Sequence, residues 1–418
     1  MKEAKTRTPS ARPWLTLFLL FGLAGRALAQ DSPPQPPVSP AILSKLFEDS
    51  EKAFGAKDYG TATSKLTELL KLCNNKPEYP LEFLMFNLGL AYLLDGKAAE
   101  AEKAFAECAK RFPKGEYASR CQLGLGKAAL AQGGEEKRKL AAEALDQAAK
   151  DPRYRAEATL PLMEFYFDTR KEEKARETLR TSMSSEVRTQ QQVSAAVDIV
   201  GVLATSGRLD DLTDYLAYLG KQPGVQDSIA WYSNQIVVKA DVRMDAGGCE
   251  AALAIYQTLL SRAKILEIQR ASMESQRKEL ARMAGEKQAA EKRGTLQGTA
   301  AASASEAIST AQAALKLNER ALATIVGMED FDASMLGRRG RGHYYLKHLK
   351  EALECFATIR EKYPESIAAE DAAYSEIAAC NELGERAKVQ ELADAFTAKY
   401  PGSLNLPKVA ELKEKAAK

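Results

Sequence analysis

Residues 85–115 read MFNLGLAYLLDGKAAEAEKAFAECAKRFPKG, and the spacing of small and large residues in this stretch decides the fold. Gly89 and Ala101 are small, so two antiparallel helices can cross closely at these positions. Pro113 ends the second helix, because proline cannot continue a helical hydrogen-bond pattern. Four larger side chains fill the space around the crossing: Met85, Leu88, Tyr92 and Phe105. The stretch therefore predicts a pair of tightly packed helices.

The pattern Met85-x-x-Leu88-Gly89-x-x-Tyr92, Ala101-x-x-x-Phe105, Pro113 resembles the tetratricopeptide repeat. Met85 stands where that repeat usually has tryptophan. The resemblance implies an all-α solenoid, in which each helical hairpin needs its neighbours to bury its apolar face.

The second half of the pattern recurs with the same spacing as Ala352, Phe356 and Pro364, and Gly340 precedes Ala352 by the same twelve residues as Gly89 precedes Ala101. Weaker copies between the two predict about eight helical pairs. We expect an N-terminal solenoid over residues 41–258, and C-terminal repeats with a capping helix over residues 327–418.

An insertion interrupts the repeats over residues 259–326. Apolar residues fall seven apart on an outgoing arm (Leu259, Leu266, Met273, Leu280) and on a return arm (Ile308, Leu315, Leu322). This spacing predicts an antiparallel coiled-coil hairpin that breaks at residues 294–298 and whose outgoing arm continues the preceding helix. The alternative is a mobile alanine-rich linker, because Arg270 and Arg277 lie where the seam would need apolar groups.

The first 29 residues have the pattern of a cleaved signal peptide. A basic start is followed by the apolar run Trp14–Gly25 and by Ala27-Leu28-Ala29, an A-x-A cleavage site. The mature chain would begin at Gln30 and would not be a lipoprotein, because no cysteine follows the cut. Residues 30–40 are rich in proline and predict an extended linker. We expect a soluble, exported protein in the periplasm or outside the cell, with no membrane-spanning segment after cleavage.

The charge of the chain argues against nucleic-acid binding. The full sequence has 59 basic and 57 acidic residues. Cleavage after residue 29 removes five basic residues and one acidic residue, which leaves 54 against 56. A nearly neutral chain lacks the concentrated positive field that displaces counterions from phosphates.

Six cysteines in an exported chain could form disulfides. Cys108 and Cys121, and likewise Cys355 and Cys380, would lie on consecutive helices. The alternative for each pair is that its members are small buried apolar residues.

Three junctions between repeats share a further pattern: residues 111–115 (RFPKG), 362–366 (KYPES) and 399–403 (KYPGS). These junctions resemble those of bacterial cell-envelope repeat proteins, the group of the outer-membrane assembly lipoprotein and the Tol-Pal-associated cell-division coordinator. The resemblance implies a periplasmic scaffold that binds proteins of the cell envelope.

Two groups of residues are candidates for partner binding. Phe86 and Leu90 lie on a second apolar face of their helix, which either receives a partner segment or is covered by neighbouring helices. Arg338 and Arg341 lie in the basic run of residues 338–343, which suits an acidic partner, and Tyr344 lies one helical turn from Arg341. The alternative for this run is a solvated helix face.

The sequence contains no recognisable catalytic or metal-binding motif. His343 and His348 are five apart and would point to different sides of a helix, so they predict no metal pair. We therefore expect no catalytic, metal or cofactor site. Self-assembly into a homo-oligomer through the hairpin and binding of peptidoglycan are the alternative functions.

Overall fold

The computed structural model describes residues 39–73, 76, 79–294 and 298–417, and these residues form helices and turns with no strand. The predicted signal peptide and most of the proline-rich linker lie outside the described residues. The linker ends one residue earlier than predicted, because Pro40 is already the first residue of a helix and Ser39 precedes it. No helix in the described part of the chain is both long enough and apolar enough to cross a membrane.

The chain divides into two compact units. The first contains residues 1–185 and 276–314, and the second contains residues 186–275 and 315–418. Helices α15 (Arg262–Lys292) and α16 (Gly298–Gly327) belong in part to each unit.

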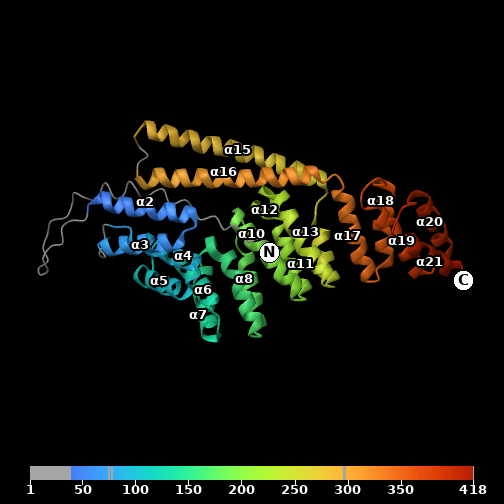
Figure 1. The fold of residues 1–418 in the computed structure, drawn as a ribbon, viewed down its shortest axis with the longest axis horizontal. Coiled ribbons are helices and arrows are strands. Elements are labelled where there is room, and N and C mark those ends of the chain that lie inside the picture. The colour runs from blue at the N-terminus through green and yellow to red at the C-terminus, as the bar shows by residue number, and fades with distance from the viewer. Residues whose placement is uncertain (1–38, 74–75, 77–78, 295–297, 418) are drawn as a thin grey trace, which may run out of the picture. The chain divides into compact units, whose positions relative to one another are not determined.

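Four helical pairs make up the body of the first unit, and successive helices pack on one another (Figure 1). The pairs are α2 (Pro40–Ala56) with α3 (Tyr59–Cys73), α4 (Leu81–Leu94) with α5 (Ala98–Arg111), α6 (Ala118–Gln132) with α7 (Glu135–Ala149), and α8 (Pro152–Asp168) with α9 (Glu172–Met183).

The second unit also contains four pairs. They are α10 (Gln190–Thr205) with α11 (Leu209–Leu219), α13 (Ile229–Asp245) with α14 (Cys249–Thr258), α17 (Phe331–Tyr345) with α18 (Leu349–Lys362), and α19 (Ala369–Leu383) with α20 (Arg386–Lys399). The short helix α12 (Pro223–Asp227) follows α11, and α21 (Leu406–Ala417) packs on α19 and α20. Val409 of α21 is buried, as a capping helix requires.

Phe105 of α5 explains why glycine stands at two helix crossings. Its ring lies against Gly89 of α4 and against Gly124 of α6, where an added Cβ would come within 2.7 Å and 2.6 Å of the ring. Real Cβ atoms do not approach that closely, so any larger residue would force the helices apart. Phe105 is 1% exposed and is the centre of this crossing.

The same arrangement recurs in the second unit. Gly340 of α17 faces the ring of Phe356 of α18, and a Cβ at Gly340 would overlap that ring. Ala352 and Phe356 are both fully or almost fully buried. The small residue on the first helix thus faces the aromatic residue on the second helix in both copies.

Acidic side chains at the start of first helices fasten the three junctions. Glu82 of α4 accepts hydrogen bonds from the backbone N–H of Tyr117 (2.6 Å) and of Glu116 (3.1 Å). Asp330, which precedes α17, accepts one from the N–H of Ile367 (3.1 Å). Glu370 of α19 accepts one from the hydroxyl of Ser403 (2.6 Å). These contacts satisfy polar groups in turns that no helix hydrogen bond reaches.

The prediction that the outgoing arm continues the preceding helix is wrong. The arm does not continue α14, because α14 ends at Thr258 and Leu259 has extended backbone (φ −72°, ψ 133°) before α15 begins at Arg262. The predicted break between the arms includes residues 295–297, which lie outside the described residues.

Arg262 holds the base of the hairpin in the second unit. Its guanidinium donates to the carbonyls of Ile325 (3.1 Å) and Val326 (2.6 Å), and its backbone N–H donates to Asp332 (2.7 Å). These bonds join Arg262 to residues that follow it by 63 to 70 positions in the sequence.

A second polar contact seats the hairpin on α12. The carbonyl of Asp227 accepts hydrogen bonds from the side-chain amides of Gln269 (3.0 Å) and Asn318 (2.9 Å). Gln269 also accepts a hydrogen bond from the N–H of Ala230 (3.0 Å) and is fully buried. Both α15 and α16 are therefore anchored at the end of α12, and α15 also contacts the start of α13.

Candidate functional site

The candidate site of the second unit is a groove along α13 and α17, here called the α13–α17 groove. It consists of two hollows of about 660 and 790 Å³ that share Asp241 and Arg338. The first hollow is lined by the C-terminal end of α13, by Cys249 and Tyr256 of α14, and by the C-terminal half of α17. The second is lined by the rest of α13, the last turns of α16 and the start of α17. Pockets of this volume accommodate a ligand or a few side chains of a partner.

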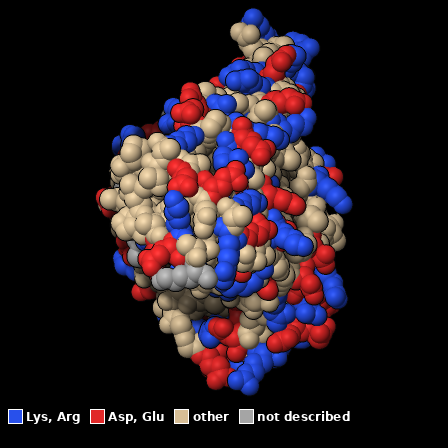
Figure 2. Space-filling model, turned by 90° about the vertical axis from the view of Figure 1, so that its right-hand side faces the viewer, with Lys and Arg blue, Asp and Glu red and all other residues tan. Residues whose placement is uncertain are grey.

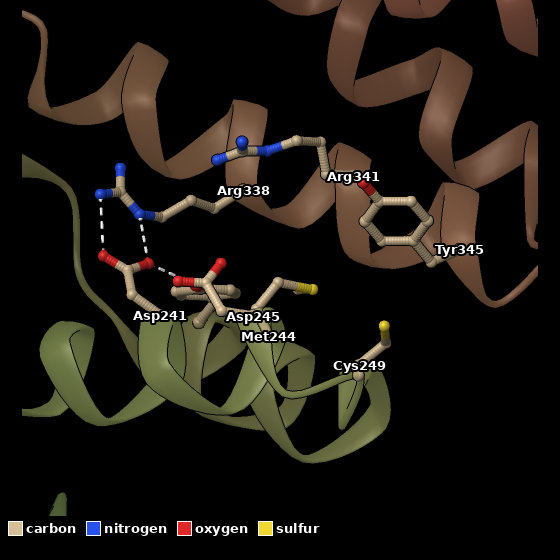
Figure 3. A pocket seen from close by; sticks show the side chains of 9 residues that line it. Asp241, Met244, Asp245, Cys249, Arg338, Arg341 and Tyr345 are labelled. Atoms are coloured by element: carbon tan, nitrogen blue, oxygen red, sulfur yellow. Dashed lines mark hydrogen bonds and ion pairs between the residues drawn. The ribbon is translucent and has the colours of Figure 1, made fainter.

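An ion pair crosses the groove where the hollows meet. Arg338 donates to both oxygens of the Asp241 carboxylate, at 2.7 Å from Nε and 3.0 Å from Nη2 (Figure 3). The hydroxyl of Tyr256 donates to the same carboxylate at 2.5 Å. Burial alone would raise the pKa of Asp241, but these hydrogen bonds outweigh it and leave the pKa lowered. The prediction that Arg338 is free for a partner is therefore wrong, because its guanidinium is neutralised within the chain.

The neighbouring Arg339 also has an internal role. Its guanidinium donates to the carbonyl of Tyr256 at 3.0 and 2.7 Å and to the carbonyl of Leu259 at 3.1 Å. These carbonyls lie at the end of α14, where helix carbonyls lack partners within the helix. Arg339 thus caps α14 and ties it to α17.

Arg341 is the member of the basic run that remains available. It is exposed and lines the first hollow, and the described residues give it no hydrogen bond or ion pair. Figure 3 places Arg341 and Tyr345 on α17, across from Met244 and Asp245 on α13. Tyr345 is 59% exposed, so an open aromatic surface adjoins the free guanidinium.

Apolar side chains line the second hollow from two helices. Trp231 and Val238 of α13 lie seven residues apart, and Val238 is 55% exposed. On α16 the lining residues Leu317, Ala321 and Thr324 recur at spacings of four and three, and Met328 follows the end of the helix. Residues at these spacings share one helix face. The groove is therefore walled by two partly apolar helix faces.

The charges around the groove are mixed. Arg320 and Glu329 line the second hollow and are exposed, and Asp245 lines the first. On the face of the molecule shown in Figure 2, Lys and Arg side chains alternate with Asp and Glu side chains. That face therefore presents no strongly basic surface of the kind that follows a nucleic-acid backbone.

Comparison with known families bears on the helix crossing around Phe105. A family model described as "Tetratricopeptide repeat" matches residues 84–115. Residues 84–115 form a tetratricopeptide repeat. No curated protein matches the chain.

Solved structures of repeat proteins show distant likeness. The complex of the TPR2AB domain of yeast Sti1 with pHSP90 is 12% identical, with a TM-score of 0.27, and the match covers 91% of this chain and 100% of that one. The human IFIT1 dimer with PPP-AAAA is 11% identical, with a TM-score of 0.29 and coverage of 90% and 83%. The P58(IPK) TPR domain is 14% identical, with a TM-score of 0.19, and the match covers 90% of this chain and 97% of that one.

Phe86 lies within the tetratricopeptide repeat and is not open to a partner, so that prediction is wrong. It is 7% exposed, and its ring lies 5.3 Å from the ring of Tyr117 and 5.9 Å from that of Phe105. The guanidinium of Arg120 lies over the ring at 4.6 Å. Leu90 is half-buried against the same core. The next helix, α6, thus covers most of this face, as the alternative interpretation held.

Tyr344 is engaged within the chain. Its hydroxyl donates to Glu382 at 2.5 Å, and Lys347 donates to the other oxygen of Glu382 at 2.7 Å. Burial is the largest cause that raises the pKa of the Tyr344 hydroxyl, and the Glu382 contact adds to it. Tyr345, which sequence reasoning missed, offers the open ring instead.

The orientation predicted for the two histidines is also wrong. Their ring centres lie 5.9 Å apart, because α17 ends at Tyr345 and His348 lies beyond its last turn. Burial lowers the pKa of His343. Among the described residues, no three His, Cys, Asp or Glu side chains are placed to hold a metal ion.

Proposed function

We propose that the protein is an exported interaction scaffold that holds a segment of a partner protein in the α13–α17 groove. The observation that carries the proposal is the pairing of an apolar hollow with the free guanidinium of Arg341 beside the exposed ring of Tyr345. Stacked helical repeats commonly use such extended surfaces for binding.

The chemistry of the groove favours a particular kind of segment. Apolar side chains of the partner would cover Val238 and the α16 face that carries Leu317 and Ala321. A carboxylate on the partner would pair with Arg341, because a guanidinium forms two parallel hydrogen bonds with a carboxylate. Asp245 on the opposite wall would disfavour a second carboxylate nearby.

The proposed location is the periplasmic side of a bacterial cell envelope. It rests on the signal-peptide pattern of residues 1–29 and on the resemblance of the three junctions to those of envelope repeat proteins. Cell fractionation and N-terminal sequencing would test it. A mature protein that begins at Gln30 in the periplasmic fraction supports the location, and an uncleaved chain in the cytosol contradicts it.

Site-specific cross-linking in intact cells would test the groove. A photoreactive residue replaces Val238 in one variant of the full-length chain and Leu404, which is 93% exposed and outside the groove, in a matched control. We expect one envelope protein to be attached through position 238 and not through position 404. The Arg341→Glu substitution should reduce that adduct by about tenfold, since loss of a charge-assisted contact costs about 1.5–3 kcal/mol.

Equal labelling at both positions, or an adduct that Arg341→Glu leaves unchanged, would exclude this groove as the binding surface. The Arg341→Lys variant is the conservative control. It keeps the positive charge but loses the planar fork, so it should retain part of the adduct.

A further inference from the structure

Two cysteines of the first unit meet at the packed face of consecutive helices. The sulfur atoms of Cys108 on α5 and Cys121 on α6 lie 2.8 Å apart, and both residues are fully buried. The thiol of Cys108 also lies 3.6 Å from the carbonyl of Glu82 on α4. The two sulfurs are therefore enclosed by three helices of the tetratricopeptide repeat and its neighbour.

The approach of these sulfurs is closer than packing alone requires. A disulfide bond is about 2.05 Å long, so closing the pair needs a movement of less than 1 Å. Cys121 follows Cys108 by 13 residues, and the turn that joins α5 to α6 already brings the two helices together.

We propose that Cys108 and Cys121 form a structural disulfide that joins α5 to α6 when the chain folds in the presence of a disulfide oxidant. This proposal is independent of the groove and of any partner. It identifies one pair among the six cysteines of the chain.

The bond would form by thiol–disulfide exchange. The thiolate of one cysteine attacks an oxidant disulfide and releases one oxidant thiol, which leaves a mixed disulfide on the protein. The thiolate of the second cysteine then attacks the protein sulfur and releases the second oxidant thiol. The two cysteine thiols together lose two protons and two electrons. These reduce the oxidant disulfide to two thiols.

Burial sets the order of events. An oxidant cannot reach either sulfur once α5 and α6 have packed, so exchange occurs while the pair is still open during folding. In the folded, reduced chain the contact with Cys108, together with burial, raises the pKa of Cys121 and suppresses the reactive thiolate. Once formed, the disulfide is shielded from reductants, which makes it structural rather than a switch.

The second pair expected from the sequence lacks this geometry. Cys355 is half-buried and Cys380 is buried, and the described residues show no contact between their sulfurs. Burial raises the pKa of both thiols. Cys355 therefore serves as a matched control within the same chain.

Refolding of the full-length chain would test the proposal. The denatured, reduced protein is refolded with a mixture of reduced and oxidised glutathione, denatured again, alkylated and digested without reductant. We expect a linked pair of peptides carrying Cys108 and Cys121, lighter by two hydrogen atoms than the separate peptides, and four alkylated cysteines. Alkylation of all six cysteines, or a linkage to any other cysteine, would overturn the proposal.

Two variants distinguish the effect of losing the disulfide from the effect of losing any one cysteine. Cys108→Ala should abolish the linked peptides and leave the unfolding midpoint in urea the same with and without oxidant. Cys355→Ala should retain both the linkage and the higher midpoint of the oxidised form. A Cys355→Ala variant that loses the linkage would contradict the assignment.

The rate of reduction by dithiothreitol would measure how well the folded protein shields the disulfide. Dithiothreitol added to the folded, oxidised protein should break the bond only at the rate of unfolding, and urea should accelerate the reduction strongly. Immediate reduction of the native protein would show that the bond is exposed, and would overturn its structural role.

Discussion

The carboxylate of Asp241 on α13 accepts two hydrogen bonds from the guanidinium of Arg338 on α17, which follows it by 97 residues. The long hairpin of α15 and α16 lies between these two residues in the sequence. The ion pair thus connects the repeats on either side of the insertion, and it lies where the two hollows of the groove meet.

Replacement of Arg338 should destabilise the protein. In the Arg338→Leu variant the Asp241 carboxylate keeps its bond from Tyr256 but loses the guanidinium. We expect the free energy of unfolding to fall by about 1–2 kcal/mol, a range reduced for solvent screening because Asp241 is partly exposed. Urea unfolding would measure the change. Arg341→Leu, three residues later and without an internal partner, should change the stability by less than about 0.5 kcal/mol.

The same ion pair predicts a dependence on pH. The pKa of Asp241 in the folded protein lies below its ordinary value of 3.8, so its contribution to stability is present above pH 3.8 and is lost as the pH falls below it. The Asp241→Asn variant lacks this contribution at every pH. Urea midpoints of both proteins should therefore differ most near neutral pH and converge in acid; a difference that grows as the pH falls would contradict this assignment.

The glycines around Phe105 should be intolerant of a single methyl group. A Cβ at Gly89 would lie 2.7 Å from the ring, so Gly89→Ala should cost about 1–3 kcal/mol through overpacking. Gly55 of α2 has no atom within 4 Å of the same added Cβ, and Gly55→Ala should be neutral or stabilising by up to about 1 kcal/mol. Thermal unfolding distinguishes the two. Gly89→Ala should cost less in a Phe105→Leu background than in the original chain, and an equal cost in both backgrounds would mean that the ring is not the cause.

The sequence predicts these crossings well because the information is local. Gly89 and Phe105, or Gly340 and Phe356, lie sixteen residues apart within one helical pair, so the spacing fixes which residues meet. The family pattern then describes their packing. Residues that bind the junctions, such as Glu82, were missed because their partners lie in the turn after the next helix, where no pattern in the chain marks them.

The groove could not be predicted, because the contacts that form it join residues far apart in the sequence. Whether Arg338 or Arg341 is free depends on Asp241, which is brought close only when the chain returns from the hairpin. Likewise, Phe86 has the composition of an open apolar face until Arg120 and Tyr117 of the following repeat cover it. Local spacing in the sequence identifies the helical pairs. Which side chains remain exposed depends on contacts between one pair and the next.

The turn at Gly115 should also be sensitive to substitution, through the hydrogen bonds of Glu82. A Cβ at Gly115 would overlap the carboxylate of Glu82, which binds the two following backbone N–H groups. The Glu82 carboxylate can move aside at the cost of these hydrogen bonds, so Gly115→Ala should lower the free energy of unfolding by about 0.5–1.5 kcal/mol. Gly402 lies in the corresponding turn of the last junction. A Cβ added at Gly402 would meet no atom within 4 Å, so Gly402→Ala should have little effect. Equal losses in the two variants would show that the turn backbone, and not Glu82, is the constraint.

The base of the hairpin should open when Arg262 is removed. Arg262→Ala leaves the carbonyls of Ile325 and Val326 without their side-chain donor, and the last turn of α16 should fray. Hydrogen–deuterium exchange of residues 320–328 should become faster, with a loss of about 1–2 kcal/mol of local stability. Lys264→Ala, which removes only an exposed contact with Glu267, is the control. Because Asp227 anchors both arms separately through Gln269 and Asn318, the faster exchange should stay confined to the end of α16. Faster exchange throughout α13 would instead mean that Arg262 supports the whole wall of the groove.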